Sequence, residues 1–167
     1  MNGVDRRTGV YHVHRARPSN GVSSASVAAC GDGADEIGVG AFDGVTVLLV
    51  EDDPVSRAAL ELIFSYYGAR VTSTESAEDA LACYEQSSPS IVVSDIGLPH
   101  ADGCNLLRAI RAHEWGRGRR TPAIAVSGFP SRDCRERVRQ AGFDAFLHKP
   151  IDVRALLKTV RALAGTS

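Results

Sequence analysis

Short apolar runs alternate with amphipathic segments from residue 45 onward, and this alternation limits the possible folds more than any other feature of the sequence. Five runs predict strands, over residues 45–50, 69–74, 90–94, 122–127 and 144–148. A helix is predicted after each strand, beginning near Asp53, Ser76, Cys104, Ser131 and Asp152. In the first helix the apolar residues that recur at helical spacing are Val55, Ala59, Leu62, Ile63 and Tyr66, and Pro54 follows the capping Asp53.

This alternation predicts a parallel sheet with helices on both faces. Right-handed crossover connections leave few topologies for such a sheet. One of them is the flavodoxin-like arrangement, a doubly wound α/β fold with five parallel strands in the order 2-1-3-4-5 and five helices. We expect this fold for residues 45–167, as one domain.

Residues 1–44 have a different composition and are predicted to form a flexible N-terminal leader. They are rich in Gly, Ser, Ala, Asp and Arg, and no apolar period persists. The stretch GVGAFDG (38–44) has glycines spaced as in a dinucleotide loop, but it precedes a strand rather than following one, so we expect no nucleotide site there. His12 and His14 lack further ligands nearby, which favours a solvated tail over a metal site.

The composition narrows the possible partners and location. The chain is 44% apolar and 23% charged, with a formal net charge of −1, which gives no general attraction for nucleic acid or an anionic membrane. No apolar run approaches the roughly 18 residues of a membrane span. The four cysteines have no CxxC spacing, which favours isolated thiols in a reducing compartment. We expect a cytoplasmic protein that binds no nucleic acid directly and no membrane.

Polar residues follow the predicted strands at their carboxyl ends, where open α/β sheets bind ligands. Glu51 and Asp52 follow the first strand and Asp95 follows the third, its neighbour in this order. Converging carboxylates repel, so we expect a bound cation or a protonated carboxyl, and an all-oxygen site suits Mg²⁺. Ser127 and Lys149 add a hydroxyl and an ammonium at the same edge. Such a set of groups suits phosphoryl transfer to an aspartate.

Each of these residues also has an ordinary structural interpretation. Asp53 is expected to act only as a helix cap, Ser127 could cap a turn, and Lys149 could be a solvated lysine. Taken one at a time, the ordinary interpretation is favoured. Their convergence at one edge of a sheet favours a functional site.

Four motifs together resemble the receiver domain of two-component response regulators, a CheY-like family. They are VLLVEDD (47–53), SDIGLPHADG (94–103), AVSG (125–128) and FLHKP (146–150), and the resemblance covers residues 45–164. The C-terminal part is also similar to receivers of hybrid histidine kinases.

The resemblance implies a role for each polar residue at the sheet edge. Asp95 would be the phosphoacceptor. The Mg²⁺ ligands would be Glu51 (through water), Asp52, Asp95 and the carbonyl of Gly97. Ser127 and Lys149 would bind the phosphoryl group, and Ser127 and Phe146 would form the switch.

The resemblance also implies partners. The donor would be a sensor histidine kinase or a histidine phosphotransfer protein, and the chain would catalyse only its own phosphorylation and dephosphorylation. Because the sequence ends shortly after Pro150, we expect output through protein contacts on the face formed by the fourth helix, fifth strand and fifth helix. Basic residues line this face, either as a solvated surface or as a docking site for an acidic partner: Arg132, Arg135, Arg137, Arg139, Arg154, Lys158 and Arg161.

Two other functions remain possible for this sequence, a hydrolase and an interaction module. An aspartyl-phosphate hydrolase usually has a second acid/base aspartate two residues after the nucleophile, where this sequence has Gly97. A non-phosphorylated interaction module is disfavoured by the occupied acidic, serine and lysine positions.

The segment WGRGRR (115–120) is predicted as a glycine-rich surface loop, with Trp115 folded over nearby apolar surface.

Overall fold

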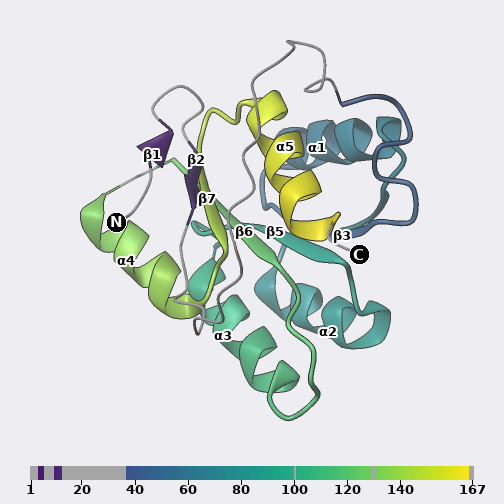
Figure 1. Cartoon of the computed structure of the whole chain (residues 1–167). Helices are drawn as coiled ribbons and strands as arrows, with labels where there is room; N and C mark the ends of the chain where they lie inside the picture. The colour runs from purple at the N-terminus through teal and green to yellow at the C-terminus, as the bar shows by residue number, and fades with distance from the viewer. Residues whose placement is uncertain (1–3, 6–9, 13–36, 100, 129–130, 166–167) are drawn as a thin grey trace, which may run out of the picture.

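The computed structural model describes residues 4–5, 10–12, 37–99, 101–128 and 131–165 (Figure 1). In these residues seven strands form one sheet: β1 Val4–Asp5, β2 Val10–His12, β3 Thr46–Val50, β4 Arg70–Thr74, β5 Ile91–Asp95, β6 Ala123–Ser127 and β7 Ala145–His148. Five helices accompany them: α1 Pro54–Tyr66, α2 Ala77–Ser87, α3 Gly103–Glu114, α4 Arg132–Ala141 and α5 Val153–Ala164.

The five strands from β3 to β7 are parallel and lie in the order β4-β3-β5-β6-β7. This is the predicted order 2-1-3-4-5, so the doubly wound fold is confirmed. Successive side chains of a strand point to opposite faces. In β3, Leu48 and Val50 therefore join the core under α2, α3 and α4, whereas Val47 and Leu49 join the core under α1 and α5. Figure 1 shows α1 and α5 above the sheet and α2 and α3 below it.

N-cap side chains stabilise the starts of the helices that follow the strands. Asp53 accepts a hydrogen bond from the Ser56 amide (2.7 Å), and this bond lowers the pKa of the Asp53 carboxyl. Ser76, Ser131 and Asp152 also accept from amides in the first turns of their helices. Asp53 is therefore a cap, as predicted.

Helix α1 presents a different face to the core from the one that the apolar spacing suggests. Val55, Leu62 and Tyr66 are 76%, 72% and 63% exposed. Leu60 and Phe64, at 5% and 0%, pack on the sheet, and of the predicted row the half-buried Ile63 joins them. Both rows have helical spacing, so periodicity alone cannot decide which row meets the sheet.

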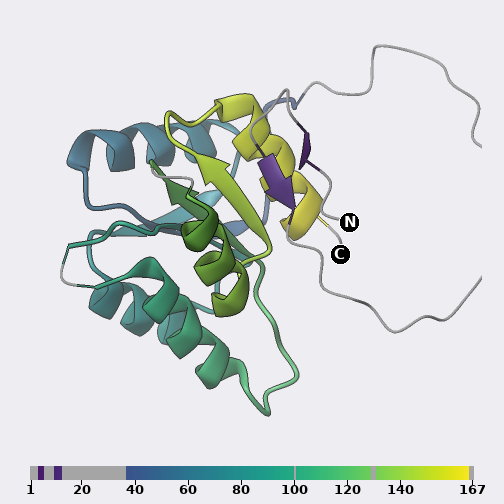
Figure 2. The same cartoon turned by 90° about the vertical axis from the view of Figure 1, so that its left-hand side faces the viewer.

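The N-terminal part of the chain adds two strands to the edge of the sheet. Strand β2 pairs antiparallel with β7, with Tyr11 opposite Phe146, and β1 pairs with β2. Figure 2 shows β2 next to β7, with β1 on the outer side of β2. These strands could not be predicted from the sequence for two reasons. Pairing at a sheet edge uses backbone N–H and C=O groups, which do not depend on the side chains. Strands of two and three residues are also too short to show an alternation of apolar and polar residues.

The packed region also begins before the predicted boundary at Val45. Phe42 is 1% exposed and joins the core under α1 and α5. Its amide donates to the Tyr67 carbonyl (2.9 Å), which ties this turn to the end of α1. Within the described part of the chain, no helix combines the length and apolarity needed to cross a bilayer.

Candidate functional site

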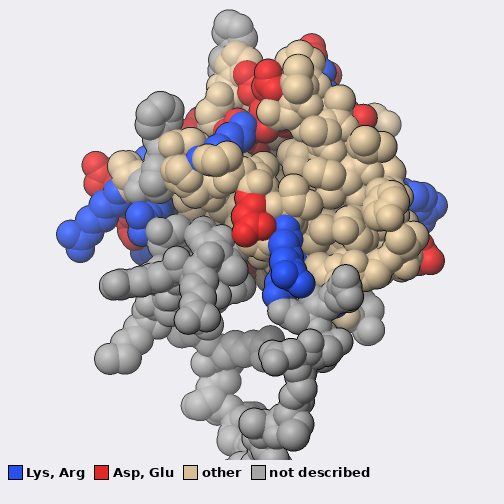
Figure 3. All heavy atoms as spheres, turned by 90° about the horizontal axis from the view of Figure 1, so that it is seen from above, with Lys and Arg blue, Asp and Glu red and all other residues tan. Residues whose placement is uncertain are grey.

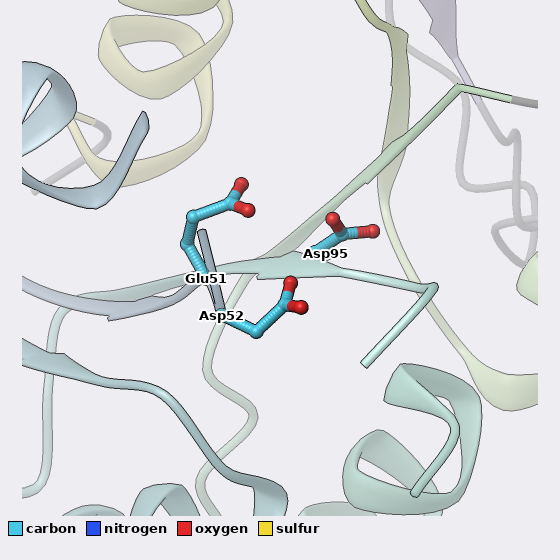
Figure 4. Close-up of side chains that lie close together, drawn as sticks. All are labelled: Glu51, Asp52 and Asp95. Carbon is cyan, nitrogen blue, oxygen red and sulfur yellow. The ribbon is translucent and has the colours of Figure 1, made fainter. Parts of the chain in front are cut away.

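Three carboxylates meet at the carboxyl edge of the sheet. Glu51 and Asp52 follow β3 directly, and Asp95 is the last residue of β5. Because β3 and β5 pair in register, with Val50 opposite Ser94, the two strand ends lie side by side. One carboxylate oxygen from each residue lies within 4.8 Å of the others, and Figure 4 shows the three side chains around a common space. The predicted convergence of the acidic residues is confirmed.

The three acidic side chains differ in burial. Glu51 is 2% exposed, Asp95 is 9% exposed and Asp52 is half-buried, so the site opens toward solvent on the Asp52 side. Like charges at this separation repel, and burial strengthens the repulsion by lowering the local dielectric. The cluster therefore needs positive charge, and oxygen ligands of this kind suit Mg²⁺.

Lys149 supplies one positive charge inside the site. Its ammonium donates to Asp95 Oδ2 at 2.5 Å and to Glu51 Oε2 at 2.8 Å. Burial would lower the pKa of Lys149, but the hydrogen bonds to Asp95 and Glu51 outweigh burial and raise it. The lysine is thus held as a cation between two carboxylates. Its amide donates to the Ser127 carbonyl (2.9 Å), which fixes the loop after β7 against the end of β6.

Asp95 is oriented by hydrogen bonds to both carboxylate oxygens. The Gly97 amide donates to Oδ1 (2.8 Å), while Lys149 binds Oδ2. A Cβ added at Gly97 would meet only Asp95 Oδ1, at 3.6 Å, so this glycine is not required by close packing. The predicted role of the Gly97 carbonyl as a Mg²⁺ ligand stays a prediction.

Ser127 and Phe146 lie on the two strands beyond Asp95. Ser127 ends β6 one residue past Val126, which is opposite Asp95, and it is 7% exposed. Phe146 lies opposite Ala125 in the register of β6 and β7, and it is 1% exposed in the core that it shares with Val138 of α4. The predicted part of Ser127 and Phe146 in a switch stays a prediction.

Arg57 is a site residue that the sequence analysis missed. Its Nη1 donates to the carbonyls of Glu51 (2.7 Å) and Asp52 (3.3 Å), so it holds the backbone that carries the acidic pair. A cation in the first turn of a helix is unfavourable next to the positive end of the helix dipole. An arginine three residues after Pro54 is therefore the signal that could have indicated a nearby hydrogen-bond acceptor for its guanidinium group.

Gly103 is a second residue whose part was missed. A Cβ at this position would lie 2.3 Å from the Asp95 carbonyl oxygen, so the start of α3 can pass the end of β5 only without a side chain. The preceding Asp102 caps α3 through the Cys104 amide (2.8 Å) and also forms an ion pair with Arg137 of α4. The close approach of Gly103 to β5 depends on a tertiary contact that the sequence pattern does not indicate.

The face of the molecule on the side of α1 and α5 carries both kinds of charge. Seen from above, acidic side chains lie near one end and close to the middle, basic side chains lie in the middle and at the sides, and wide uncharged areas separate them (Figure 3). The exposed Val55, Leu62 and Tyr66 of α1 contribute apolar surface on this side of the sheet.

The doubly wound sheet, with three carboxylates and a lysine at its carboxyl edge, defines the receiver class of signalling domains. The response regulator receiver domain family matches residues 47–161, and the chain belongs to this family. It is therefore a receiver of two-component signalling, and receivers in general are phosphoacceptor switches rather than turnover enzymes.

Three similar proteins illustrate the relationship. The polar-differentiation response regulator DivK of Brucella ovis is 28% identical over 120 residues, which cover 72% of this chain and 96% of DivK. The receiver domain of the sensor histidine kinase PA1611 of Pseudomonas aeruginosa, with a magnesium ion coordinated in its active-site cleft, is 33% identical with a TM-score of 0.67, over 73% of this chain and 98% of that one. The receiver domain of the histidine kinase CKI1 of Arabidopsis thaliana, complexed with Mg²⁺ and BeF₃⁻, is 30% identical with a TM-score of 0.64, over 74% of this chain and 93% of that one.

Proposed function

We propose that Asp95 accepts a phosphoryl group from a phosphohistidine of a sensor histidine kinase or a histidine phosphotransfer protein. The observation that carries the proposal is the position of the Asp95 carboxylate, 2.5 Å from the Lys149 ammonium and within 4.8 Å of the Glu51 and Asp52 carboxylates. Similarity to DivK and to the PA1611 receiver supports it.

In the transfer, an Asp95 carboxylate oxygen attacks phosphorus in line with the leaving imidazole. An O–P bond forms, the P–N bond breaks, and the imidazole departs as a neutral leaving group after taking up a proton. Lys149 Nζ and the Ser127 hydroxyl bind the equatorial oxygens of the transferred group. The product is an aspartyl phosphate, and its hydrolysis by water returns the carboxylate.

Mg²⁺ fits the acidic cluster as the cofactor. The residues that would hold it are Asp52 and Asp95 directly, Glu51 through water, and the carbonyl of Gly97. The ion would neutralise charge on the transferred phosphoryl oxygens. The magnesium ion in the PA1611 receiver and the Mg²⁺ in the CKI1 receiver support this assignment. Arg57 would position Glu51 and Asp52 through its hydrogen bonds to their backbone carbonyls.

The exposed apolar row of α1 is the docking surface that we assign to the donor. Asp53 caps α1 directly after the acidic pair, so the first turn of α1, with Val55, adjoins the acceptor site. Leu62 and Tyr66 continue the row away from it. An apolar stripe that begins beside the acceptor fits a donor helix that carries the phosphohistidine.

Phosphorylation would be read out on the face formed by α4, β7 and α5. A phosphoryl group on Asp95 attracts Ser127, and Phe146 moves within the core that it shares with α4. The exposed arginines Arg132 and Arg137 on α4 and Arg154 on α5 give this face a basic character that fits an acidic protein partner. We place the protein in the cytoplasm, which suits its free thiols Cys83, Cys104 and Cys134.

The test is incubation of the full chain with Mg²⁺ and acetyl phosphate, followed by intact mass spectrometry. The proposal predicts a gain of one phosphoryl group that requires Mg²⁺. No gain with acetyl phosphate or with a donor kinase would favour an inert interaction module on the same fold. Rapid multiple turnover of a small phosphoester would instead favour a hydrolase.

A further inference from the structure

We propose that the end of the molecule opposite the acidic site binds a small phosphorylated ligand with an aromatic ring, of the nucleotide class. A hollow of about 540 Å³ lies between the end of α3, the loop before β6 and the end of α4. The residues of its wall that could bind a ligand are Arg108, Arg111, Trp115, Arg119 and Arg120. This volume falls within the range typical of small-molecule sites.

The charge around this hollow is not balanced locally. Arg108 donates to the neutral Asn105 amide oxygen, Arg117 contacts the His113 ring, and Arg119 donates to the Ser88 and Pro89 carbonyls. Within the described part of the chain, none of these three arginines forms an ion pair with a carboxylate. A positive pole therefore gathers here, although the whole chain has a net charge of −1.

Two further arginines are fixed in place at the same wall. Arg111 and Arg120 both donate to the Gly142 carbonyl, at 3.0 and 2.8 Å, and both form ion pairs with Asp144, at 3.5 and 2.6 Å. Arg111 also pairs with Glu114 (2.7 Å), so these two guanidinium groups are ordered and partly neutralised. Guanidinium groups that are already ordered lose little side-chain entropy when they bind a phosphate, and their planar forks match phosphate oxygens. Arg111 Nε is buried and has no hydrogen-bond partner within the described residues, so this atom adds no donor to the exposed surface of the hollow.

Trp115 supplies an aromatic face at the rim. Its sequence context predicts an indole folded over apolar surface, and this prediction is wrong, because Trp115 is 89% exposed. Gly116 and Gly118 follow it with φ of 80° and 66°, so the WGRGRR loop turns tightly and keeps Trp115 beside the arginines. Figure 2 shows this loop, between α3 and β6, projecting from the bottom of the molecule. An exposed indole next to guanidinium groups suits stacking of a nucleobase whose phosphates bind the arginines.

The site is independent of the proposed phosphorylation. The hollow lies at the amino ends of β6 and β7, whereas Asp95 lies at the carboxyl edge of the sheet. Loss of ligand binding in this hollow would therefore leave labelling by acetyl phosphate unchanged, and the two proposals can fail separately.

Trp115 is the only tryptophan of the chain, so its emission reports directly on the hollow. We expect ADP to quench it saturably, with pyrophosphate competing and adenosine alone binding more weakly. Calorimetry checks the affinity without the fluorophore, and there Trp115→Ala is expected to weaken ADP binding about tenfold.

Arg108→Gln is the charge variant of choice, because Arg108 is exposed and its guanidinium donates to the amide oxygen of the neighbouring Asn105 (2.7 Å). It is expected to weaken ADP binding about tenfold, a loss typical of one charged hydrogen bond to phosphate. Arg132→Gln, at the opposite end of α4 from the hollow, is the matched control and is expected to bind ADP normally.

Three results would overturn the inference. The first is the absence of saturable heat or quenching at millimolar ADP. The second is an equal loss of affinity in Arg108→Gln and Arg132→Gln, which would indicate general charge attraction. The third is tighter binding of a single-stranded oligonucleotide than of ADP, which would make this end a nucleic-acid surface.

Discussion

The Lys149 ammonium lies 2.5 Å from Asp95 Oδ2 and 2.8 Å from Glu51 Oε2, so one cation joins the proposed acceptor to the most buried carboxylate of the site. In this position the lysine stabilises the unmodified site against the repulsion of its carboxylates. The same ammonium lies where the oxygens of a phosphoryl group on Asp95 would arrive.

Replacing Lys149 by Gln should slow phosphorylation of Asp95 by about 10²–10³-fold, the usual loss when a group that stabilises developing negative charge is removed. The measurement is the initial rate of labelling by acetyl phosphate, followed by intact mass. Lys158→Gln is the matched control, since Lys158 is the only other lysine of the chain and lies on α5. Equal rates for the two variants would contradict the assigned part of Lys149.

Glu114 should make the fold sensitive to acid. It is 7% exposed and accepts from the Tyr84 hydroxyl (2.7 Å), the Thr121 amide (2.6 Å) and Arg111 (2.7 Å). Burial raises the pKa of Glu114, but these hydrogen bonds outweigh it and hold the pKa below the ordinary value of 4.5. The carboxylate therefore contributes stability above about pH 4.5, and this contribution is lost as the pH falls through the lowered pKa.

Glu114→Gln should lower the free energy of unfolding at pH 7 by about 1–3 kcal/mol. The difference from the unmodified protein should shrink below pH 4.5, because Glu114 itself becomes protonated there. Urea unfolding across this pH range is the measurement, with the exposed Glu78→Gln as a control expected to change stability by about 0.5 kcal/mol or less. A difference independent of pH would show that the charge of Glu114 is not what stabilises the network.

Two glycines beside the acceptor should respond differently to alanine. At Gly103 the new Cβ would lie 2.3 Å from the Asp95 carbonyl oxygen and 3.1 Å from Ile96 Cα, so backbone must move, at a loss of about 1–3 kcal/mol of stability. At Gly97 it would lie 3.6 Å from Asp95 Oδ1, an ordinary contact. We expect slower labelling and lower stability only in Gly103→Ala. Similar unfolding curves and labelling rates for both variants would refute the close approach at Gly103.

Phe42 should set how much of the N-terminus can be removed. Deleting residues 1–36 removes β1 and β2 but leaves Phe42 in the core, so the receiver should fold and be labelled. Deleting residues 1–44 also removes Phe42 and should lower stability by about 3–5 kcal/mol, as Phe42→Ala should in the full chain. Thermal and urea unfolding of the three variants is the test. Equal stability of the two deletions would show that Phe42 does not support the core.

The strands, the helices and the polar residues at the strand ends could be predicted because local patterns determine them. Buried strands read as continuous apolar runs, and caps such as Asp53 and Ser131 mark where helices begin. The strand order came from known folds rather than from periodicity, and it brought Asp52 and Asp95 to the same edge. Polar residues at successive strand ends were then sufficient to indicate the site.

The features that escaped prediction depend on tertiary contacts. Which row of α1 meets the sheet is decided by the packing of Phe64, since Leu62 lies on an equally periodic row. Pairing of β2 with β7 uses backbone groups that no sequence pattern marks. The hydrogen bonds of Arg57 to the carbonyls after β3 likewise become visible only once the helix is placed.

The most direct test of the central claim is chemical identification of the phosphorylated atom. Borohydride reduces an aspartyl phosphate to homoserine, so the chain is labelled with acetyl phosphate and Mg²⁺, reduced, digested and mapped by tandem mass spectrometry. We expect homoserine at position 95 and at no other aspartate, and no homoserine after labelling of Asp95→Asn. Homoserine at Asp52 or Asp53, or none in a chain that has gained a phosphoryl group, would contradict the assignment of Asp95 as the acceptor.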